Sequence, residues 1–226
     1  MLKDLLSLIY PQVCVICPED LYQGEKFICS KCRYQLPRTG FHQLSDNPVA
    51  KHFWGRIPVE GATSYFYFNK GLKVQELIHQ VKYRGKKELG VYLGDMFGSE
   101  LKLSPFAQKI DLVIPVPLHE QKQKKRGFNQ SYYIAKGIAD ALSAKCVPDL
   151  IRRSVATDTQ TRKSRIKRWE NVEDKFVATH SDQLQNKHVL LVDDVVTTGS
   201  TLEACARAIL EVQGTKVSIA TLACTE

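Results

Sequence analysis

Apolar residues along this chain fall into two alternating spacings, which predict strands and helices in turn. Continuous apolar or aromatic runs predict strands at 59–68, 109–117, 188–194 and 216–224. Apolar residues three and four positions apart predict helices at 74–85, 89–97, 128–142 and 202–214. Residues 147–151 fit a further short strand, and residues 152–170 fit a long basic loop or partial helix. Strands that alternate with amphipathic helices indicate a parallel α/β sheet.

The first 58 residues lack this alternation. Residues 1–40 hold four of the seven cysteines, whereas residues 41–58 are polar and aperiodic with prolines, as in a linker. We therefore expect a cysteine module at 1–40, a linker at 41–58 and a main α/β domain at 59–226. The apolar content of 43% and charged content of 25% are ordinary for a water-soluble globular protein of this length.

Two acids close the clearest of the strands, in the stretch VLLVDDVVTTGST at 189–201. Asp193 and Asp194 lie where parallel sheets bind ligands, at the carboxyl end of a strand. The helix that follows would offer unpaired N–H groups and a positive dipole to an anion. A plain turn with a helix N-cap is the alternative, but the pattern is narrower than a cap requires. The expected anion-binding residues are Val196, Thr197, Thr198, Gly199, Ser200 and Thr201.

The acid pair restricts which anion can bind beside it. At about 4 Å and an effective dielectric of about 20, a carboxylate repels a unit negative charge by roughly 4 kcal/mol. A ligand whose hydroxyls donate to the carboxylates, or which brings a divalent cation, avoids this repulsion. A ribose 5-phosphate has a phosphate for the loop and hydroxyls for the acids, and an additional pyrophosphate would bring Mg²⁺.

Four cysteines form two paired knuckles near the start of the chain. Cys14-x2-Cys17 and Cys29-x2-Cys32 are separated by eleven residues, and four thiolates at this spacing suit tetrahedral Zn²⁺ in a structural site. Iron–sulfur ligation and four unrelated buried cysteines are the alternatives. Metal binding would order so small a module, because isolated zinc peptides gain about 10–16 kcal/mol on binding. The remaining three cysteines fit core positions.

The sequence resembles two nested families. VLLVDDVVTTGST resembles the signature of type I phosphoribosyltransferases, in which the acid pair holds the ribose hydroxyls of phosphoribosyl pyrophosphate and the next loop holds its 5-phosphate. KYRG, IPVPLH, KRGFNQ and TDTQTRKSRIKRWENV, at 82–85, 114–119, 125–130 and 157–172, resemble the competence-protein F (ComF) family. The resemblance covers nearly the whole chain. It implies a parallel-sheet type I phosphoribosyltransferase-like domain with a small N-terminal four-cysteine zinc module.

The same resemblance implies roles for the loop at 115–128. This loop corresponds to the one that contacts pyrophosphate, and we expect Pro117, Arg126 and Gly127 to bind there. Lys122 and Lys124 are equally compatible with a solvated basic loop.

Two further basic segments lie outside that loop. Residues 152–170 correspond to a lid over the substrate, with Gln160, Arg162 and Arg165 at its polar positions. Lys82 and Arg84 either reach the same cleft or only cap the C-terminus of their helix.

Two departures from the family pattern affect the expected substrate. Thr197 stands where purine-salvage members carry a carboxylate, which argues against transfer to a purine. Nothing substantial follows the last strand, so we expect any base-recognising hood to come from residues 1–60.

Two classes of function follow. The first is an enzyme that binds phosphoribosyl pyrophosphate with Mg²⁺ and transfers the phosphoribosyl group to an unknown acceptor. In it, Asp193 and Asp194 orient the sugar, and Arg126, Arg162 and Arg165 stabilise the departing pyrophosphate. The alternative is a non-catalytic factor that handles single-stranded DNA with the DNA-uptake machinery, and uses the same domain as a ligand sensor or grip. The net charge of +8 suits both.

Aromatic residues in or near the cysteine module bear on the second function. Phe27, Tyr34, Phe53 and Trp54 would either stack on bases or cover the seam between the two modules. The N-terminus is no convincing signal peptide, and no apolar run is long enough to cross a bilayer. A soluble cytoplasmic protein is therefore expected.

Overall fold

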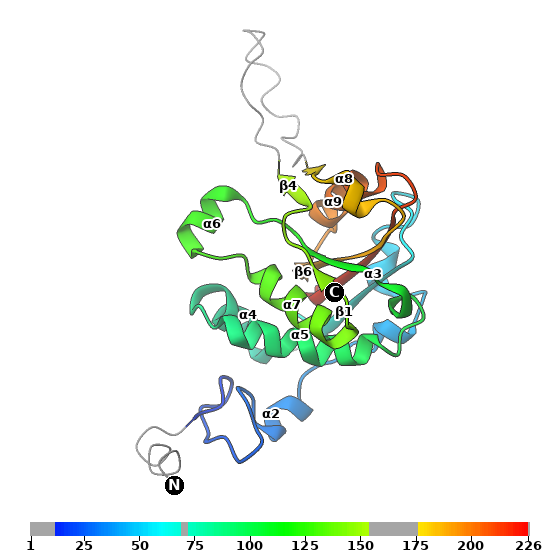
Figure 1. Cartoon of the computed structure of the whole chain (residues 1–226). Coiled ribbons are helices and arrows are strands. Elements are labelled where there is room, and N and C mark those ends of the chain that lie inside the picture. The colour runs from blue at the N-terminus through cyan, green and yellow to red at the C-terminus, as the bar shows by residue number, and fades with distance from the viewer. Residues whose placement is uncertain (1–11, 69–71, 154–175, 226) are drawn as a thin grey trace, which may run out of the picture.

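A five-stranded parallel sheet forms the centre of the molecule. The computed structural model describes residues 12–68, 72–153 and 176–225. The strand order is β1-β7-β6-β2-β3 (Figure 1). The strands are β1 (Gly61–Tyr67), β2 (Leu112–Pro115), β3 (Lys145–Cys146), β6 (His188–Val196) and β7 (Lys216–Cys224). All four neighbouring pairs in this sheet run parallel, so the carboxyl ends of β2, β6 and β7 meet at one edge.

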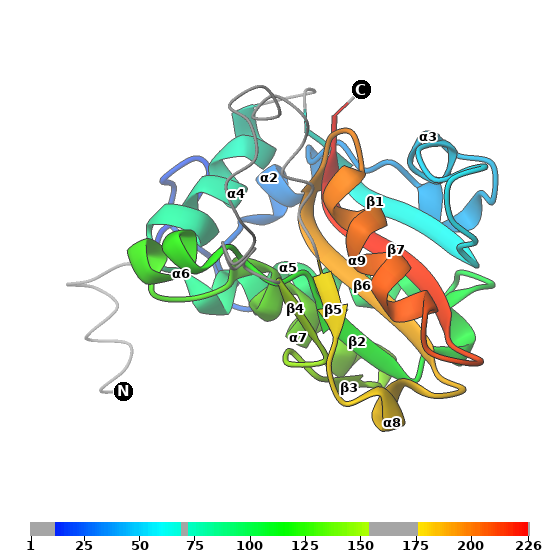
Figure 2. The same ribbon diagram turned by 90° about the horizontal axis from the view of Figure 1, so that it is seen from above.

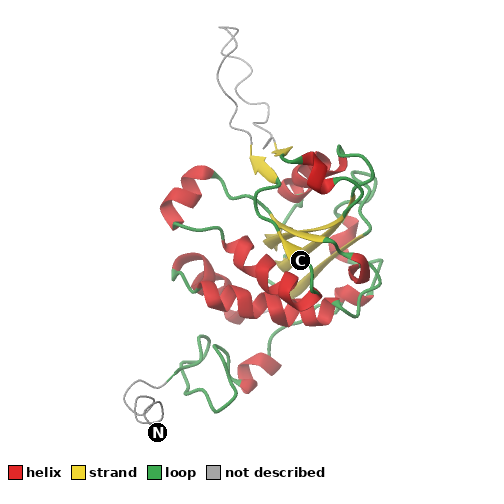
Figure 3. Ribbon diagram, in the orientation of Figure 1, coloured by secondary structure: helices red, strands yellow, loops and turns green. Residues whose placement is uncertain are grey.

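Helices cover both faces of the sheet, because alternate strand residues are buried on opposite sides. In β6, Leu190 and Val192 belong to one core, whereas Val189 and Leu191 belong to the other. The first face is covered by α4 (Leu72–Tyr83), α5 (Lys87–Leu101) and α7 (Gln130–Leu142). The second is covered by α9 (Ser200–Leu210), with the short helices α3 (Pro48–Lys51) and α8 (Ser181–Leu184) nearby (Figures 2 and 3).

Two glycines allow α5 and α7 to approach closely. A Cβ on Gly94 would lie 2.1 Å from the carbonyl oxygen of Ile134, and a Cβ on Gly137 would lie 2.0 Å from that of Val91. Any larger residue would force the helices apart. This contact fixes α7, whose first turn contributes to the candidate site.

Within the predicted α/β domain, the secondary structure departs from the sequence prediction at residues 115–128 and 147–151. The predicted loop at 115–128 contains helix α6 (Glu120–Arg126), which ends at Gly127 in the left-handed conformation, with φ of 80°. Residues 147–150 of the predicted strand are not a strand but lie between β3 and β4 (Ile151–Arg153), and β4 pairs antiparallel with β5 (Phe176–Ala178) in a separate ribbon.

Residues 41–58, predicted to be a linker, are packed against the sheet. They contain a single 3₁₀ turn (Phe41–Gln43) and α3, and the Phe53 side chain is completely buried. Phe41, Val49 and Ile57 join the same core as α9. The domain boundaries themselves remain predictions, but this segment is part of the α/β core.

The cysteine-containing residues 12–35, with helix α2 (Ser30–Tyr34), lie beyond α4 and α5 on the side away from the sheet (Figure 1), whereas Arg38 pairs with Phe66 at the edge of β1. The Phe27 ring contacts Tyr92 of α5 at 5.6 Å between centroids, and Lys73 of α4 donates a hydrogen bond to Gln35. Within the described part of the chain, no helix is long and apolar enough to span a membrane.

Candidate functional site: a cationic cleft around two acids

Asp193 and Asp194 lie within the last part of β6, so the strand itself fixes their backbone. Asp193 is level with Thr221 of β7, and one residue earlier Val192 is level with Pro115 of β2. The Asp194 side chain is buried and that of Asp193 is half-buried. Both carboxylates therefore lie at the carboxyl edge of the sheet, where the sequence placed them.

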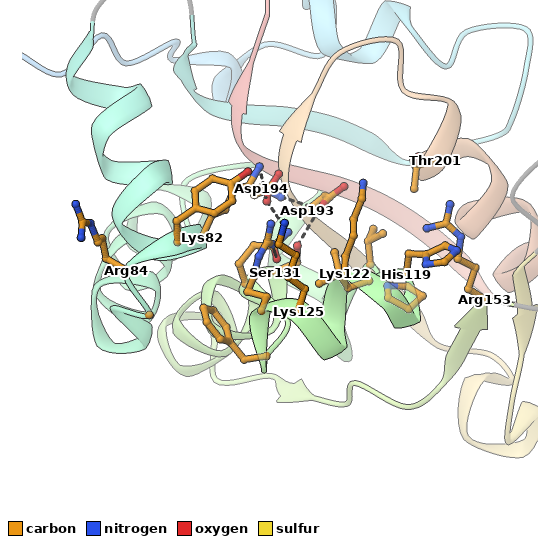
Figure 4. A pocket seen from close by; sticks show the side chains of 18 residues that line it. Lys82, Arg84, His119, Lys122, Lys125, Ser131, Arg153, Asp193, Asp194 and Thr201 are labelled. Atoms are coloured by element: carbon orange, nitrogen blue, oxygen red, sulfur yellow. Dashed lines mark hydrogen bonds and ion pairs between the residues drawn. The ribbon is translucent and has the colours of Figure 1, made fainter.

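The first turn of α7 supplies hydrogen bonds to both acids (Figure 4). Ser131 Oγ donates to Asp193 Oδ1 at 2.8 Å, and the backbone N–H of Asp194 donates to the same oxygen at 2.8 Å. Gln130 Nε2 donates to Asp194 Oδ2 at 2.6 Å. The Asn129 side chain caps α7 by accepting from Ser131 N at 3.0 Å, which holds this turn in place.

Two cations approach the acids from neighbouring helix ends. Lys82 Nζ lies 2.9 Å from Asp194 Oδ2. Arg126, the last residue of α6, donates to Gln130 Oε1, and its guanidinium lies 5.4 Å from the centre of the Tyr83 ring. Gln130 thus separates the positive Arg126 from the negative Asp194 while bonding to both.

Burial, and after it the negative charge of Asp194, raise the pKa of Asp193 to about 7. The hydrogen bonds from Ser131 and from the Asp194 N–H, and the charge of Lys82, act in the opposite direction. The acid pair therefore carries less negative charge near neutral pH than two ordinary aspartates would.

The loop after the acids forms a small hollow of about 60 Å³, lined by Asp193 and residues 195–202. Gly199 adopts the left-handed conformation with φ of 76°, immediately before α9 begins at Ser200. Thr198 Oγ1 and Ser200 Oγ lie 3.2 Å apart in a hydrogen bond. A Cβ on Gly199 would lie 3.1 Å from the Phe53 ring, so the segment at 41–58 supports this loop from behind.

A larger cleft of about 860 Å³ has both acids in its lining. Its Lys and Arg residues are Lys82, Arg84, Lys122, Lys125, Arg126 and Arg153. Aromatic and apolar surface comes from Tyr83, Phe128 and residues 116–118. Asp193 and Thr201 line both the cleft and the hollow, so the two cavities adjoin.

The structure brings most of the predicted site residues together at this edge of the sheet. Asp193, Asp194, Lys82, Arg84, Arg126, Pro117 and Thr201 line the cleft, and residues 196–201 line the hollow. Gly127 ends α6 directly after Arg126. Gln160, Arg162 and Arg165 lie outside the described residues. The assignment of binding roles to all of these residues remains a proposal.

Several residues of the site were not expected from the sequence. Gln130 and Ser131, which bond to the acids, were given no role from the sequence, and Tyr83, His119 and Phe128 also line the cleft. The available signal was the polar start of the apolar helix α7, which follows α6 by four residues. None of the described residues 12–60 lines the cleft, and the hood expected from residues 1–60 remains a prediction.

The four cysteines of the knuckles converge. Their Sγ atoms all lie within 4.8 Å of one another, and Cys17 Sγ and Cys29 Sγ are 3.6 Å apart. A tetrahedral zinc with bonds of about 2.3 Å would set its sulfurs about 3.8 Å apart, so the cluster fits such a metal. Although burial raises the pKa of Cys14, backbone N–H groups such as that of Cys29, 3.4 Å from its Sγ, lower it to about 7.

Acids at the end of a central parallel strand, followed by a hydroxyl-rich loop, define a phosphoribosyltransferase-type domain. The sequence model of the phosphoribosyl transferase domain matches residues 129–225, which contain the acid pair and its loop.

Relatives that span nearly the whole chain define the family more narrowly. The DNA utilization protein YhgH of Salmonella typhi is 30% identical over 214 residues, with 90% of this chain and 92% of that protein covered. The competence protein ComFC of Bacillus subtilis is 24% identical over 229 residues, with 90% of each chain covered. This chain belongs to the ComF/YhgH family, and the four-cysteine cluster is consistent with a zinc module in front of its phosphoribosyltransferase domain.

Among solved structures, the chain is similar to the glutamine phosphoribosylpyrophosphate amidotransferase of Bacillus subtilis, at 20% identity and a TM-score of 0.38. The match covers 59% of this chain and 26% of that enzyme. The chain therefore spans about a quarter of that protein's length.

Proposed function

We propose that the cleft binds phosphoribosyl pyrophosphate together with Mg²⁺, and that it transfers the phosphoribosyl group to an acceptor. One observation carries the proposal: both acids line a cationic cleft that adjoins a small hydroxyl-lined hollow at Asp193. The hollow suits the 5-phosphate, the carboxylates suit the ribose hydroxyls, and the cations suit the pyrophosphate. The 5-phosphate, the ribose and the pyrophosphate of this ligand are thus each matched by one part of the site.

Each group of residues would contribute differently to the transfer. Asp193 and Asp194 orient the ring by accepting from its hydroxyls, and the hollow at 196–201 anchors the phosphate. The bond from ribose C1 to pyrophosphate breaks as the acceptor bonds to C1, and Arg126 with Lys125 stabilises the charge that leaves. Mg²⁺ bound with the ligand would neutralise part of the same charge. Gln160, Arg162 and Arg165 are proposed to join them from the lid.

Asp194→Asn tests the donor site directly. The variant keeps the shape of the side chain but loses its charge, so we expect the affinity for phosphoribosyl pyrophosphate with Mg²⁺ to fall at least tenfold in calorimetry. Asp182→Asn, in the remote and exposed helix α8, should bind like the unaltered protein. If the unaltered protein gives no binding heat, or both variants bind equally well, the proposal is wrong.

A second function is favoured by the relatives, which are named for DNA utilization and for competence. In this alternative the protein handles single-stranded DNA during DNA uptake, and the donor site is a sensor or grip. The exposed face of α6 and two exposed aromatic side chains support it, since Tyr34 is 92% and Trp54 53% exposed. The Phe53 side chain is fully buried, and the Phe27 ring packs against Tyr92 of α5. These two rings are therefore not available to stack on bases.

Fluorescence anisotropy with a labelled single-stranded oligonucleotide distinguishes this function. Phosphate contacts release counterions, so binding should weaken steeply as salt rises. Changing Lys124, Lys125 and Arg126 together to alanine should weaken it further, and competition by phosphoribosyl pyrophosphate would indicate a shared cleft. The absence of binding at low salt would rule the alternative out.

A further inference from the structure

Lys82 already has an anionic partner in the protein without ligand. Its Nζ lies 2.9 Å from Asp194 Oδ2, and the two side chains are only 21% and 9% exposed. Val81, the preceding residue of α4, is 1% exposed, so the end of this helix is anchored in the core. Lys82 is therefore held against one of the two carboxylates expected to accept the ribose hydroxyls.

The oxygen that Lys82 contacts is also bonded by Gln130. Asp194 Oδ2 accepts from Gln130 Nε2 at 2.6 Å, and the amide oxygen of Gln130 accepts from Arg126, which fixes the orientation of the amide. This carboxylate oxygen consequently has two donors before any ligand arrives. A ribose hydroxyl can use it fully only if Lys82 moves away.

We propose that Lys82 is a specificity-determining residue, which makes the cleft favour phosphoribosyl pyrophosphate over ribose phosphates that lack a diphosphate. The inference rests on the proposed function, because it concerns how the same cleft selects its donor. A diphosphate offers Lys82 a new anionic partner at the moment it leaves Asp194. Ribose 5-phosphate offers none, because its phosphate belongs in the hollow beyond Asp193.

The positions of the side chains support this division. Figure 4 shows Lys82 and Arg84 on the α4 side of the acids, whereas Thr201, at the hollow, lies on the opposite side. A phosphate bound at Thr201 therefore gives Lys82 no anionic partner to replace Asp194. Breaking a partly buried ion pair without replacing the partner is unfavourable. The cost of separating Lys82 from Asp194 therefore lowers the affinity for ribose 5-phosphate, in addition to the contacts that this ligand lacks.

Calorimetry tests this inference. It measures the affinities for ribose 5-phosphate and for phosphoribosyl pyrophosphate, each with Mg²⁺, in the unaltered protein, in Lys82→Met and in Arg84→Met. Lys82→Met should bind ribose 5-phosphate at least tenfold more tightly than the unaltered protein, because Asp194 is released. The same variant should bind phosphoribosyl pyrophosphate at least tenfold more weakly, because one cation for the diphosphate is lost.

Arg84→Met is the matched control. Arg84 lines the same cleft two residues later, and among the described residues no acid is paired with it. Its removal should weaken the binding of phosphoribosyl pyrophosphate without tightening that of ribose 5-phosphate. This result is expected for any residue that only binds the diphosphate. A tighter binding of ribose 5-phosphate in Lys82→Met alone would therefore be due to the loss of the Lys82–Asp194 ion pair.

A second measurement starts from the unaltered protein. Inorganic pyrophosphate with Mg²⁺ should draw Lys82 away from Asp194, and should therefore tighten the binding of ribose 5-phosphate to the unaltered protein. The same addition should have no such effect in Lys82→Met, whose melting temperature serves as the check on folding.

The outcomes separate the inference from the proposed function. If the unaltered protein binds phosphoribosyl pyrophosphate, but neither Lys82→Met nor pyrophosphate tightens ribose 5-phosphate binding, the role of Lys82 is refuted and the donor site stands. If the unaltered protein binds neither ligand, the proposed function fails and this inference fails with it.

Discussion

At the level of single residues, Asp193 and Asp194 are adjacent in the chain but have different partners. Asp194 has the ammonium of Lys82 and the amide of Gln130. The hydrogen bonds of Asp193 come from a hydroxyl and a backbone N–H, and burial beside a second acid raises its pKa to about 7. The two acids are thus chemically distinct before a ligand binds.

This difference gives a pH dependence of stability. Because the pKa of Asp193 is higher in the folded protein than the usual value near 4, the folded state holds more protons than the unfolded state between about pH 4 and 7. The contribution of this residue to stability is therefore present below that range and is lost as pH rises through it.

Asp193→Asn should remove this dependence, since the amide resembles the protonated acid. We expect the variant to gain stability relative to the unaltered protein as pH increases from about 5 to 8, measured by denaturant unfolding at several pH values. Asp182→Asn, at an exposed site, should follow the unaltered protein throughout. A stability difference for Asp193→Asn that does not vary with pH would contradict the raised pKa.

The acids and their loop could be predicted because they are contiguous and follow an unmistakable strand. Gln130 and Ser131 could not be predicted as their partners, because that pairing depends on how α7 is placed against the sheet. Its placement follows from the contact of Gly94 and Gly137 across the α5–α7 interface, which the apolar periodicity of either helix alone does not contain.

At the level of elements, the segment at 41–58 supports the hydroxyl-rich loop. Phe53 packs behind Gly199, and Arg56 forms an ion pair with Glu203 of α9. Arg207, one turn further along α9, donates to the carbonyl oxygen of Arg56 at 2.8 Å. The loop and the first turns of α9 are therefore held by a segment more than 140 residues earlier in the sequence.

Phe53→Ala should destabilise the protein by about 3–5 kcal/mol, because it removes a completely buried ring. We also expect the affinity for ribose 5-phosphate to fall, since the loop around Gly199 loses its support. Trp54→Ala, at the exposed neighbouring residue, should cost less than about 1 kcal/mol. Denaturant unfolding and calorimetry of both variants check this, and equal costs would argue that 41–58 is a linker after all.

Helix α6 shows why some elements were missed. Its sequence EQKQKKR contains no apolar residue, so the spacing of apolar residues gives no signal. The sequence signals for this helix lie at its ends, where the His119 side chain caps the first turn and Gly127 follows the last turn. The long apolar strands and striped helices, in contrast, were predicted because burial determines both their sequence and their position.

At the level of the whole molecule, the four-cysteine cluster and the cleft lie on opposite sides of the α4–α5 layer. The cluster is joined to that layer by the Phe27–Tyr92 contact and by the bond from Lys73 to Gln35. None of the four cysteines lines the cleft. A metal held by them would act on the folding of residues 12–38 rather than on the bound ligand.

One zinc per chain is expected in the purified protein. Cys17→Ser should lower the zinc content, lower the melting temperature and expose residues 12–38 to proteases, because three thiolates hold the metal more weakly. Cys146→Ser, outside the cluster, should retain the metal. Elemental analysis that finds no stoichiometric metal, together with no stabilisation by added zinc, would refute the assignment.

The position of β7 has a consequence for how the protein is made. β7 lies between β1 and β6 in the sheet, although it follows both in the chain, and Phe66 is level with Ala223. During synthesis, β1 and β6 leave the ribosome without the strand that separates them. The sheet cannot close until residues 216–224 have emerged, so the edge of β6 that carries Asp193 stays unpaired until then. Until then the unpaired strand edges are exposed to other chains, as expected for a fold in which distant segments must pair.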